Sequence, residues 1–140
     1  MNAHRRQSLL AAVTPLLEPH EQVEVTTIVN LSSVSVGRTA AFAAASAILS
    51  GGALAVVPAR TPLYLAMTDR RILIFRANRS VDHVLTIPRA GLVRTAVKER
   101  VLNSSFTVSS PGSEQGLKII FPLISRTDRN AIAAALPLAR

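Results

Sequence analysis

The chain has 140 residues, 49% of them hydrophobic, which suffices for one domain with its own core and leaves little room for a second. It contains no cysteine, so disulfides, thiolate metal sites and thiol catalysis are excluded. The formal net charge of +8 permits an anionic partner, either nucleic acid or a membrane surface, although an Arg-rich and Ala-rich composition of genomic origin explains the charge equally well.

The N-terminal part of the chain predicts a helix, a turn and a strand. Residues 4–13 carry apolar side chains at helical spacing, and Pro15 ends this helix before a turn that reaches residue 20. Residues 23–29 are rich in β-branched side chains, which is typical of a strand. The pair Arg5-Arg6 imitates an export signal, but the apolar run behind it is interrupted and has no cleavage site, so we expect a cytoplasmic protein.

The next segment, residues 36–60, is rich in small side chains, and its part 39–59 carries no charge. That part has the length of a membrane span, but it consists mostly of Ala and contains Gly51-Gly52, which weakens a helix by about 2 kcal/mol relative to Ala-Ala. Two interpretations stay open. The segment is either an Ala-rich helical insert that packs on the protein or on a second copy, or a segment that touches the membrane on its cytoplasmic face.

From residue 62 onward the sequence predicts strands joined by polar turns, followed by one helix. Alternation within 92–98 places Arg94 and Lys98 on one strand face. Thr127 is expected to cap a C-terminal helix at 127–136, with Asp128 in its first turn. The predicted fold class is mainly β (α+β), a bent sheet covered by that helix. The expected strands are 63–67, 72–75, 84–87, 92–98, 105–108 and 117–123.

Three stretches resemble the motifs of one family. Tyr64-Leu-Ala-Met-Thr-Asp-Arg-Arg-Ile-Leu-Ile-Phe75 resembles the strand–turn–strand signature of bacterial pleckstrin-homology-like and GRAM-like domains. Leu17-Glu-Pro-His-Glu21 is similar to the turn that often precedes the first strand, with His20 where Gly is usual. Thr86-Ile-Pro-Arg-Ala-Gly-Leu92 is similar to the stretch that follows the hairpin. The resemblance covers residues 17–136, apart from the insert.

The resemblance implies a seven-stranded, strongly bent sheet or split barrel with a C-terminal capping helix, here preceded by an N-terminal helix and turn at 1–20. The whole chain, 1–140, is then a single domain. Members of this family bind lipid headgroups, peptides or protein subunits. The motif marks a fold more than a function, because this fold carries many functions.

Residues suited to catalysis are few. The histidines His4, His20 and His83 are scattered, and the neighbours Asp82 and His83 point to opposite faces of a strand. The sequence has no metal-binding, nucleophile or phosphate-loop motif, so we expect a non-enzymatic protein without a cofactor or metal. Nucleic acid is disfavoured as a partner because aromatic residues make up only 4% of the chain and no recognition helix is predicted.

Basic residues in or beside the turns are the candidate ligand-binding residues. Turns gathered at one end of a sheet can converge on an anionic headgroup, which Arg binds through two hydrogen bonds. The alternative is a solvated basic rim that keeps sheet edges from associating. For Arg70 and Arg71 a structural role within the hairpin is a further alternative, because both residues are part of the fold motif. The candidates are Arg70, Arg71, Arg76, Arg79, Arg94 and Lys98.

Three functional hypotheses follow, the third being an enzyme with a substrate pocket inside the bent sheet. The leading one is a binding or scaffolding module of the pleckstrin-homology-like type, whose partner is another protein or a second copy held through the Ala-rich insert. The alternative is a membrane-surface module that binds anionic lipid headgroups through its basic turns while the insert touches the bilayer.

Overall fold

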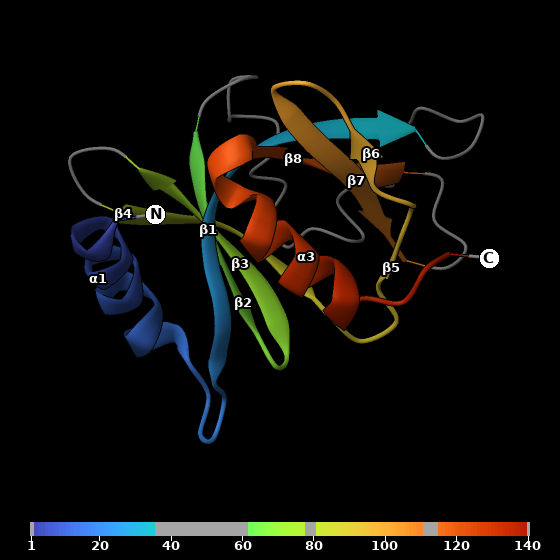
Figure 1. Cartoon of the computed structure of the whole chain (residues 1–140). Helices are drawn as coiled ribbons and strands as arrows, with labels where there is room; N and C mark the ends of the chain where they lie inside the picture. Colours follow the sequence, from blue (N-terminus) through green and yellow to red (C-terminus); the bar gives the residue numbers. More distant parts are fainter. Residues whose placement is uncertain (1, 36–61, 78–80, 111–114, 140) are drawn as a thin grey trace.

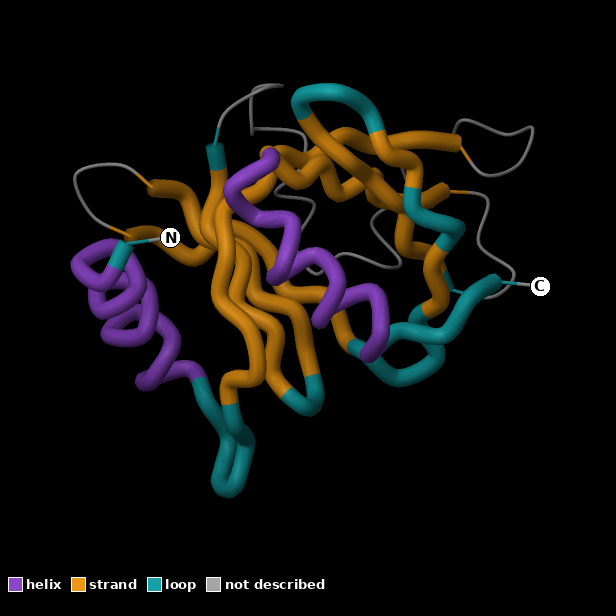
Figure 2. Tube along the Cα trace, in the orientation of Figure 1, coloured by secondary structure: helices purple, strands orange, loops and turns teal. Residues whose placement is uncertain are grey.

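The protein is a bent, mainly antiparallel β-sheet with one helix before it and one after it (Figures 1 and 2). The computed structural model describes residues 2–35, 62–77, 81–110 and 115–139. In chain order the elements are α1 (Ala3–Val13), the 3₁₀ turn η1 (Thr14–Leu16), β1 (Val23–Ser35), β2 (Leu63–Thr68), β3 (Arg71–Ala77), β4 (Val81–Pro88), β5 (Val93–Arg94), β6 (Lys98–Glu99), β7 (Asn103–Ser109), β8 (Gln115–Pro122), the 3₁₀ turn η3 (Leu123–Ser125) and α3 (Arg126–Ala135).

The bend of the sheet comes from β1, which is shared between two groups of strands. Its first part, Val23–Val29, pairs with β2, and its second part, Asn30–Ser35, pairs with β8. The strand order is β4-β3-β2-β1-β8-β7-β5, with β6 also paired to β7. β4 and β5 form the two edges of this order and do not pair with each other in the described part of the chain, so the sheet there is bent and unclosed.

The main core fills the inside of the bend, and α3 lies across it (Figure 1). From α3, Ile132, Ala133 and Leu136 at its end join buried side chains from both groups of strands. Phe106 of β7 and Phe121 of β8 meet inside, with ring centroids 5.2 Å apart. The expectation of a C-terminal helix lying on the sheet is therefore confirmed.

A second cluster lies on the outer face of the sheet, under α1. Leu9 and Val13 of the helix are fully buried against side chains of β2 and β3. All six residues of β2 are buried: Leu63, Leu65 and Met67 in the main core, and Tyr64 and Ala66 in the outer cluster, while Thr68 binds Glu21. This explains why 63–67 is a continuous apolar run in place of the alternation of a half-exposed strand. The sheet residues of this outer cluster are Tyr64, Ala66, Leu73 and Phe75.

The predicted strand at 92–98 is wrong. It is divided into the short strands β5 and β6, both paired with β7. Arg94 lies opposite Val108, so a regular antiparallel strand would bring Lys98 opposite Ser104, yet Lys98 lies opposite Ser105. This shift of one residue turns every later side chain to the other face. Arg94 and Lys98 therefore do not share a strand face.

The start of the C-terminal helix also differs from the prediction. The helix begins at Arg126, so Thr127 is inside it and does not cap it. The N-cap position belongs to Ser125, whose hydroxyl donates to the carbonyl of Ile28, 2.9 Å away, in place of a capping bond. Asp128 does lie in the first turn, as expected.

The insert at 36–60 lies outside the described residues. No helix among those that are described is both long and apolar enough to cross a membrane.

Candidate functional site

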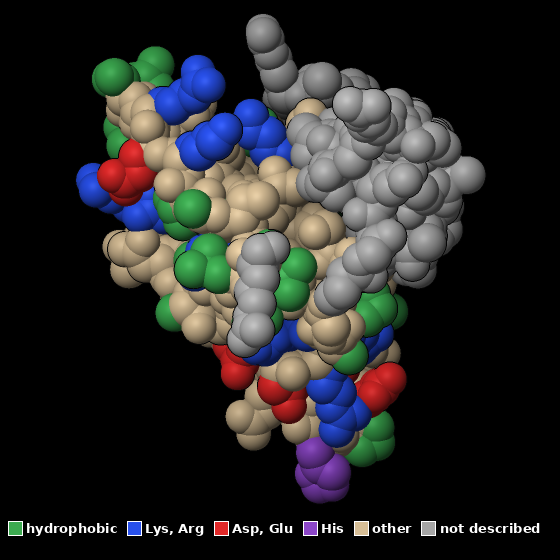
Figure 3. All heavy atoms as spheres, turned by 90° about the vertical axis from the view of Figure 1, so that its right-hand side faces the viewer, with side chains coloured by type: hydrophobic (Ala, Val, Ile, Leu, Met, Phe, Trp, Pro, Cys, Tyr) green, Lys and Arg blue, Asp and Glu red, His purple; other side chains and the backbone are tan. Residues whose placement is uncertain are grey.

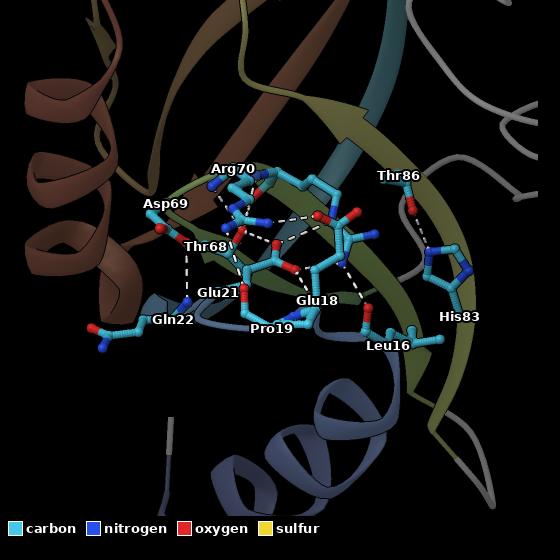
Figure 4. Close-up of polar contacts among 11 residues, drawn as sticks. Leu16, Glu18, Pro19, Glu21, Gln22, Thr68, Asp69, Arg70, His83 and Thr86 are labelled. Carbon is cyan, nitrogen blue, oxygen red and sulfur yellow. Dashed lines mark hydrogen bonds and ion pairs between the residues drawn. The ribbon is translucent and has the colours of Figure 1, made fainter.

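The first two candidate residues, Arg70 in the β2–β3 turn and Arg71 at the start of β3, contact the segment before β1 (Figure 4). The side chain of Glu21 is fully buried there. Its carboxylate accepts a hydrogen bond from Thr68 Oγ1 at 2.6 Å and two from Arg71, from Nε at 3.0 Å and from Nη2 at 2.6 Å. Arg71 also donates to the carbonyl of Leu16 at 2.7 Å. Its guanidinium is thus bound within the protein.

These contacts explain why a carboxylate can be buried at this position. The hydrogen bonds from Arg71 outweigh the opposing effect of burial and lower the pKa of Glu21 from 4.5 to about 2. The same bonds raise the pKa of Arg71 further above its usual value. A charged pair with all its oxygens hydrogen-bonded is the form in which burial is tolerated. The pair therefore joins the turn before β1 to the hairpin.

Arg70 has a similar role nearer the surface. It donates to Glu18 at 2.7 Å and to the carbonyl of Pro19 at 3.3 Å, and both partners of the ion pair are partly exposed. His20, which lies between Pro19 and Glu21 in the chain, has a φ of +67°, a backbone conformation that Gly adopts without strain. Arg70 and Arg71 thus link the two stretches 17–21 and 68–71, which both carry the family resemblance. We interpret them as structural residues.

Arg94 is bound to the C-terminal helix. Its Nε donates to the carbonyl of Ala133 at 2.7 Å, and the guanidinium lies 6.0 Å from the centre of the Phe106 ring. The backbone of Arg94 also bonds to Pro137 and Ala139, which fixes the chain beyond α3 to the sheet. Arg94 therefore holds the helix against the bend, since the last carbonyls of a helix have no partner within it.

The structure adds Arg89, which the sequence did not single out. Its Nη1 donates to Glu24 and to the carbonyl of Thr68, each at 2.7 Å, and its Nη2 to the carbonyl of Ala135 at 3.3 Å. Arg89 thus joins the start of the sheet, the hairpin and the end of α3. Its place in the 86–92 motif, directly after Pro88, is the one signal that points to it.

The remaining candidates are dispersed. Arg76 lies at the far end of β3, opposite Asp82 of β4 and away from the β2–β3 turn. Lys98 is exposed on β6. Arg79 lies outside the described residues. The described members of the candidate set therefore do not converge on one anion site.

His83 lies on β4 next to Asp82, whose partner position on β3 is Arg76. The ring of His83 meets Phe75 edge-on, with centroids 5.4 Å apart, and its Nε2 lies 2.7 Å from Thr86 Oγ1 (Figure 4). Partial burial lowers the pKa of this imidazole. Among the residues whose placement is described, no group of three His, Cys, Asp or Glu side chains is positioned to hold a metal ion.

A surface that the sequence did not predict lies at the β6–β7 turn and the adjoining η3. Val101 and Leu102 in the turn are 88% and 74% exposed, and Leu123 and Ile124 in η3 are 53% and 70% exposed. The predicted last strand, 117–123, ended at Leu123. That is wrong because β8 ends at Pro122 and the chain turns outward into η3. We call these four residues, with Lys98, Arg100 and Arg126, the β6–β7 surface.

A shallow hollow of about 110 Å³ separates the turn from η3 within this surface. Val101 and Leu123 line it together with Arg100, so the two apolar pairs are neighbours although they are more than twenty residues apart in the chain. Glu99 at its rim accepts from Arg126 at 3.2 Å and from the buried Arg129 at 2.9 Å. These contacts, chiefly the one from Arg129, lower the pKa of Glu99.

Side-chain types on this surface are mixed. Figure 3 shows hydrophobic and basic side chains together at its upper left, beside acidic ones. No family model matches the chain. A search of curated proteins gives no significant match either. We therefore infer the function from the geometry: Arg70, Arg71 and Arg94, three of the six residues predicted to bind an anion, are bound within the fold, whereas the β6–β7 surface presents apolar side chains to solvent.

Proposed function

We propose that this chain is a non-enzymatic binding module of the pleckstrin-homology-like type, which presents the β6–β7 surface to a partner. Two observations support the family part of the proposal. The sheet is bent and unclosed, with a C-terminal helix across it. Two of the stretches that carry the resemblance, 17–21 and 64–75, bind each other through Glu21, Thr68 and Arg71.

The exposed aliphatic cluster carries the functional part of the proposal. Val101, Leu102, Leu123 and Ile124 are each more than half exposed, and one residue of each neighbouring pair, Val101 and Leu123, lines the hollow. Scattered exposed aliphatic residues are ordinary, but a contiguous group rimmed by charged side chains is typical of an interaction site. The neighbouring hollow of about 110 Å³ is smaller than pockets that hold small-molecule substrates, roughly 300–1,000 Å³, which favours a surface contact over catalysis.

Photo-crosslinking in cells tests this proposal. A photoreactive phenylalanine derivative at position 102 is expected to form adducts with a lipid or a protein. The same group at position 138 serves as the matched control, because Leu138 is also exposed, at 56%, but lies beyond the opposite end of α3. Absence of adducts at position 102, or equal adducts at both positions, would contradict a partner at the β6–β7 surface.

The other predicted binding modes are affected differently by the structure. Self-association through the segment 36–60 and anion binding at Arg79 stay predictions, because both lie outside the described residues. Lipid binding through Arg70 and Arg71 is no longer favoured, since their guanidinium groups already bind Glu18 and Glu21.

A further inference from the structure

We propose that the residues after α3, Pro137–Ala139, form a strap that closes the β5 edge of the sheet against pairing with a second copy of the chain. The strap lies beyond the opposite end of α3 from the β6–β7 surface, so this inference is independent of the proposed function. β5 is one of the two edges of the strand order, and an uncovered edge offers its free backbone groups to another strand.

The strap pairs with β5 through its backbone and runs parallel to it (Figure 1). Arg94 donates from its backbone N–H to the carbonyl of Pro137 at 2.9 Å, and its carbonyl accepts from the backbone N–H of Ala139 at 2.8 Å. The next backbone N–H along the strand, that of Thr95, donates in the other direction, to β7. The strap therefore occupies the two backbone groups of Arg94 that face away from β7.

β5 lacks the protection that the other edge strand carries in its own sequence. β4 exposes Asp82 and His83 and ends at Pro88, and charged side chains and proline on an edge strand disfavour pairing with another chain. β5 contains one charged residue, Arg94, whose guanidinium is bound to the carbonyl of Ala133 within the molecule. The strap therefore supplies a cover that the side chains of β5 do not provide.

The way the strap is held allows it to open while the rest of the fold stays closed. Pro137, Leu138 and Ala139 are all exposed, so they bury little apolar surface. Leu136, which precedes them, is buried in the core and has extended backbone angles, φ −110° and ψ 133°, as expected for a residue before proline. Leu136 thus anchors one end of the strap, and a segment with few buried contacts beyond such an anchor opens locally at low free-energy cost.

Hydrogen exchange at two neighbouring amides tests the strap in the full chain. Ala139→Pro removes the N–H that donates to Arg94, so the Arg94 amide should exchange about fivefold faster, the effect of one lost backbone hydrogen bond. The Thr95 amide, which donates to β7, should keep its rate. Leu138→Pro is the matched control, because in an extended segment the N–H at this position points away from β5, and it should leave the Arg94 amide unchanged.

The mass of the protein in solution tests what the strap prevents. A variant that ends at Leu136 lacks the strap, and its average mass in sedimentation should exceed that of the full chain and rise with concentration. The difference should be larger in about 0.5 M salt than in about 0.1 M salt, because salt screens the repulsion between copies whose net charge is positive. At concentrations where the variant associates, its Arg94 amide should exchange slowly again, since a strand of the second copy then covers it.

Three results would overturn the proposal. They are an Arg94 amide that exchanges at the natural rate in Ala139→Pro, equal acceleration by Ala139→Pro and Leu138→Pro, and equal masses with and without the strap at every concentration and salt level. If the shortened variant does not fold, Ala139→Pro at full length replaces it, and a mass equal to that of the natural sequence contradicts the proposal in the same way. None of these measurements involves position 102, so their failure is distinguishable from a failure of the proposed function.

Discussion

Glu21 is the residue on which the contact between the N-terminal turn and the hairpin depends. Its carboxylate is fully buried and takes hydrogen bonds from Thr68, from Arg71 and from the backbone N–H of Glu18 at 2.9 Å. In the folded protein its pKa is about 2, whereas an ordinary glutamate has 4.5. Folding therefore favours the charged form, and the carboxylate stabilises the folded state by about 3 kcal/mol wherever the unfolded chain is also ionised.

This shift predicts a pH dependence of stability. Because the pKa is lowered on folding, the stabilisation is complete above about pH 5 and is lost as the pH falls toward 2. Glu21→Gln should lower the free energy of unfolding at pH 7 by about 3 kcal/mol and should flatten its decline in acid. Urea unfolding at about pH 7, 4.5 and 3 gives the free energy of unfolding at each pH and so measures both effects.

The matched control is Glu18→Gln, which removes the exposed partner of Arg70. An exposed ion pair contributes about 0–1 kcal/mol, so this variant should lie close to the natural sequence. Parallel curves of stability against pH for Glu21→Gln and the natural sequence would show that Glu21 does not have the proposed role.

His20 offers a second test at the residue scale. Its φ of +67° costs an L-residue about 1 kcal/mol and costs Gly nothing. His20→Gly should therefore raise the unfolding temperature by about 2–4 °C, with part of the gain offset by greater freedom in the unfolded chain. His20→Ala keeps the strain and should give no rise. Calorimetry measures both, and a lower unfolding temperature for the Gly variant would contradict the turn geometry.

The sequence identified many of these residues but not their roles. Arg70 and Arg71 were singled out as basic residues in a turn, with an anion site and a structural role both left open. Their partners Glu18 and Glu21 are fifty or more positions earlier in the chain. A local pattern does not reveal such a pairing, because it depends on how the two segments meet in space.

At the scale of elements, β5 shows how much a single extra residue changes. Before β6 the chain shifts by one position against β7, which separates Arg94 from Lys98. Thr95 supports the transition, because its backbone donates to Thr107 and its hydroxyl accepts from the backbone N–H of the same residue, both at 2.9 Å. Period-two alternation alone predicts an unbroken strand here, since it contains no information on the partner strand.

The consequence for Arg94 can be measured. Arg94→Met keeps the length of the side chain but leaves the Ala133 carbonyl with only the weak 3.4 Å bond from Leu136. We expect the free energy of unfolding to fall by about 1–3 kcal/mol, the range for a lost charge-assisted hydrogen bond. Lys98→Met, on the exposed strand β6, should change it by less than about 0.5 kcal/mol. Equal losses for the two variants would show that Arg94 does not hold α3.

For α1 and the β2–β3 hairpin, the sequence predicted the elements but not how they pack. The apolar spacing in 4–13 correctly predicted α1, and the apolar runs on either side of Thr68–Arg71 correctly predicted the β2–β3 hairpin. The destination of α1, the outer face of that hairpin, was not predicted. A helix with an apolar stripe needs an apolar surface to cover, and the continuous runs of β2 and β3 supplied one on each side of the sheet.

At the scale of the whole molecule, charge and apolar surface are distributed unevenly. Arg70, Arg71, Arg89 and Arg94 all bind groups of the protein itself, so these four guanidinium groups are less available to a partner than exposed basic side chains are. Exposed basic side chains at the β6–β7 surface are near the projecting aliphatic residues. This combination, more than the total charge, is the basis for proposing the β6–β7 surface as a contact site for a partner.

The sequence by itself determined the composition of the core, the sheet-rich fold class, the hairpin at Thr68–Arg71 and the two helices that flank the sheet. These features are encoded in the spacing of neighbouring residues, which fixes local backbone preference and the buried face. Only the tertiary structure decided which arginines are bound internally, where β5 slips against β7 and which leucines face water. Those outcomes depend on contacts between segments far apart in the chain, and the bend of β1, which brings both parts of the sheet around one core, creates them.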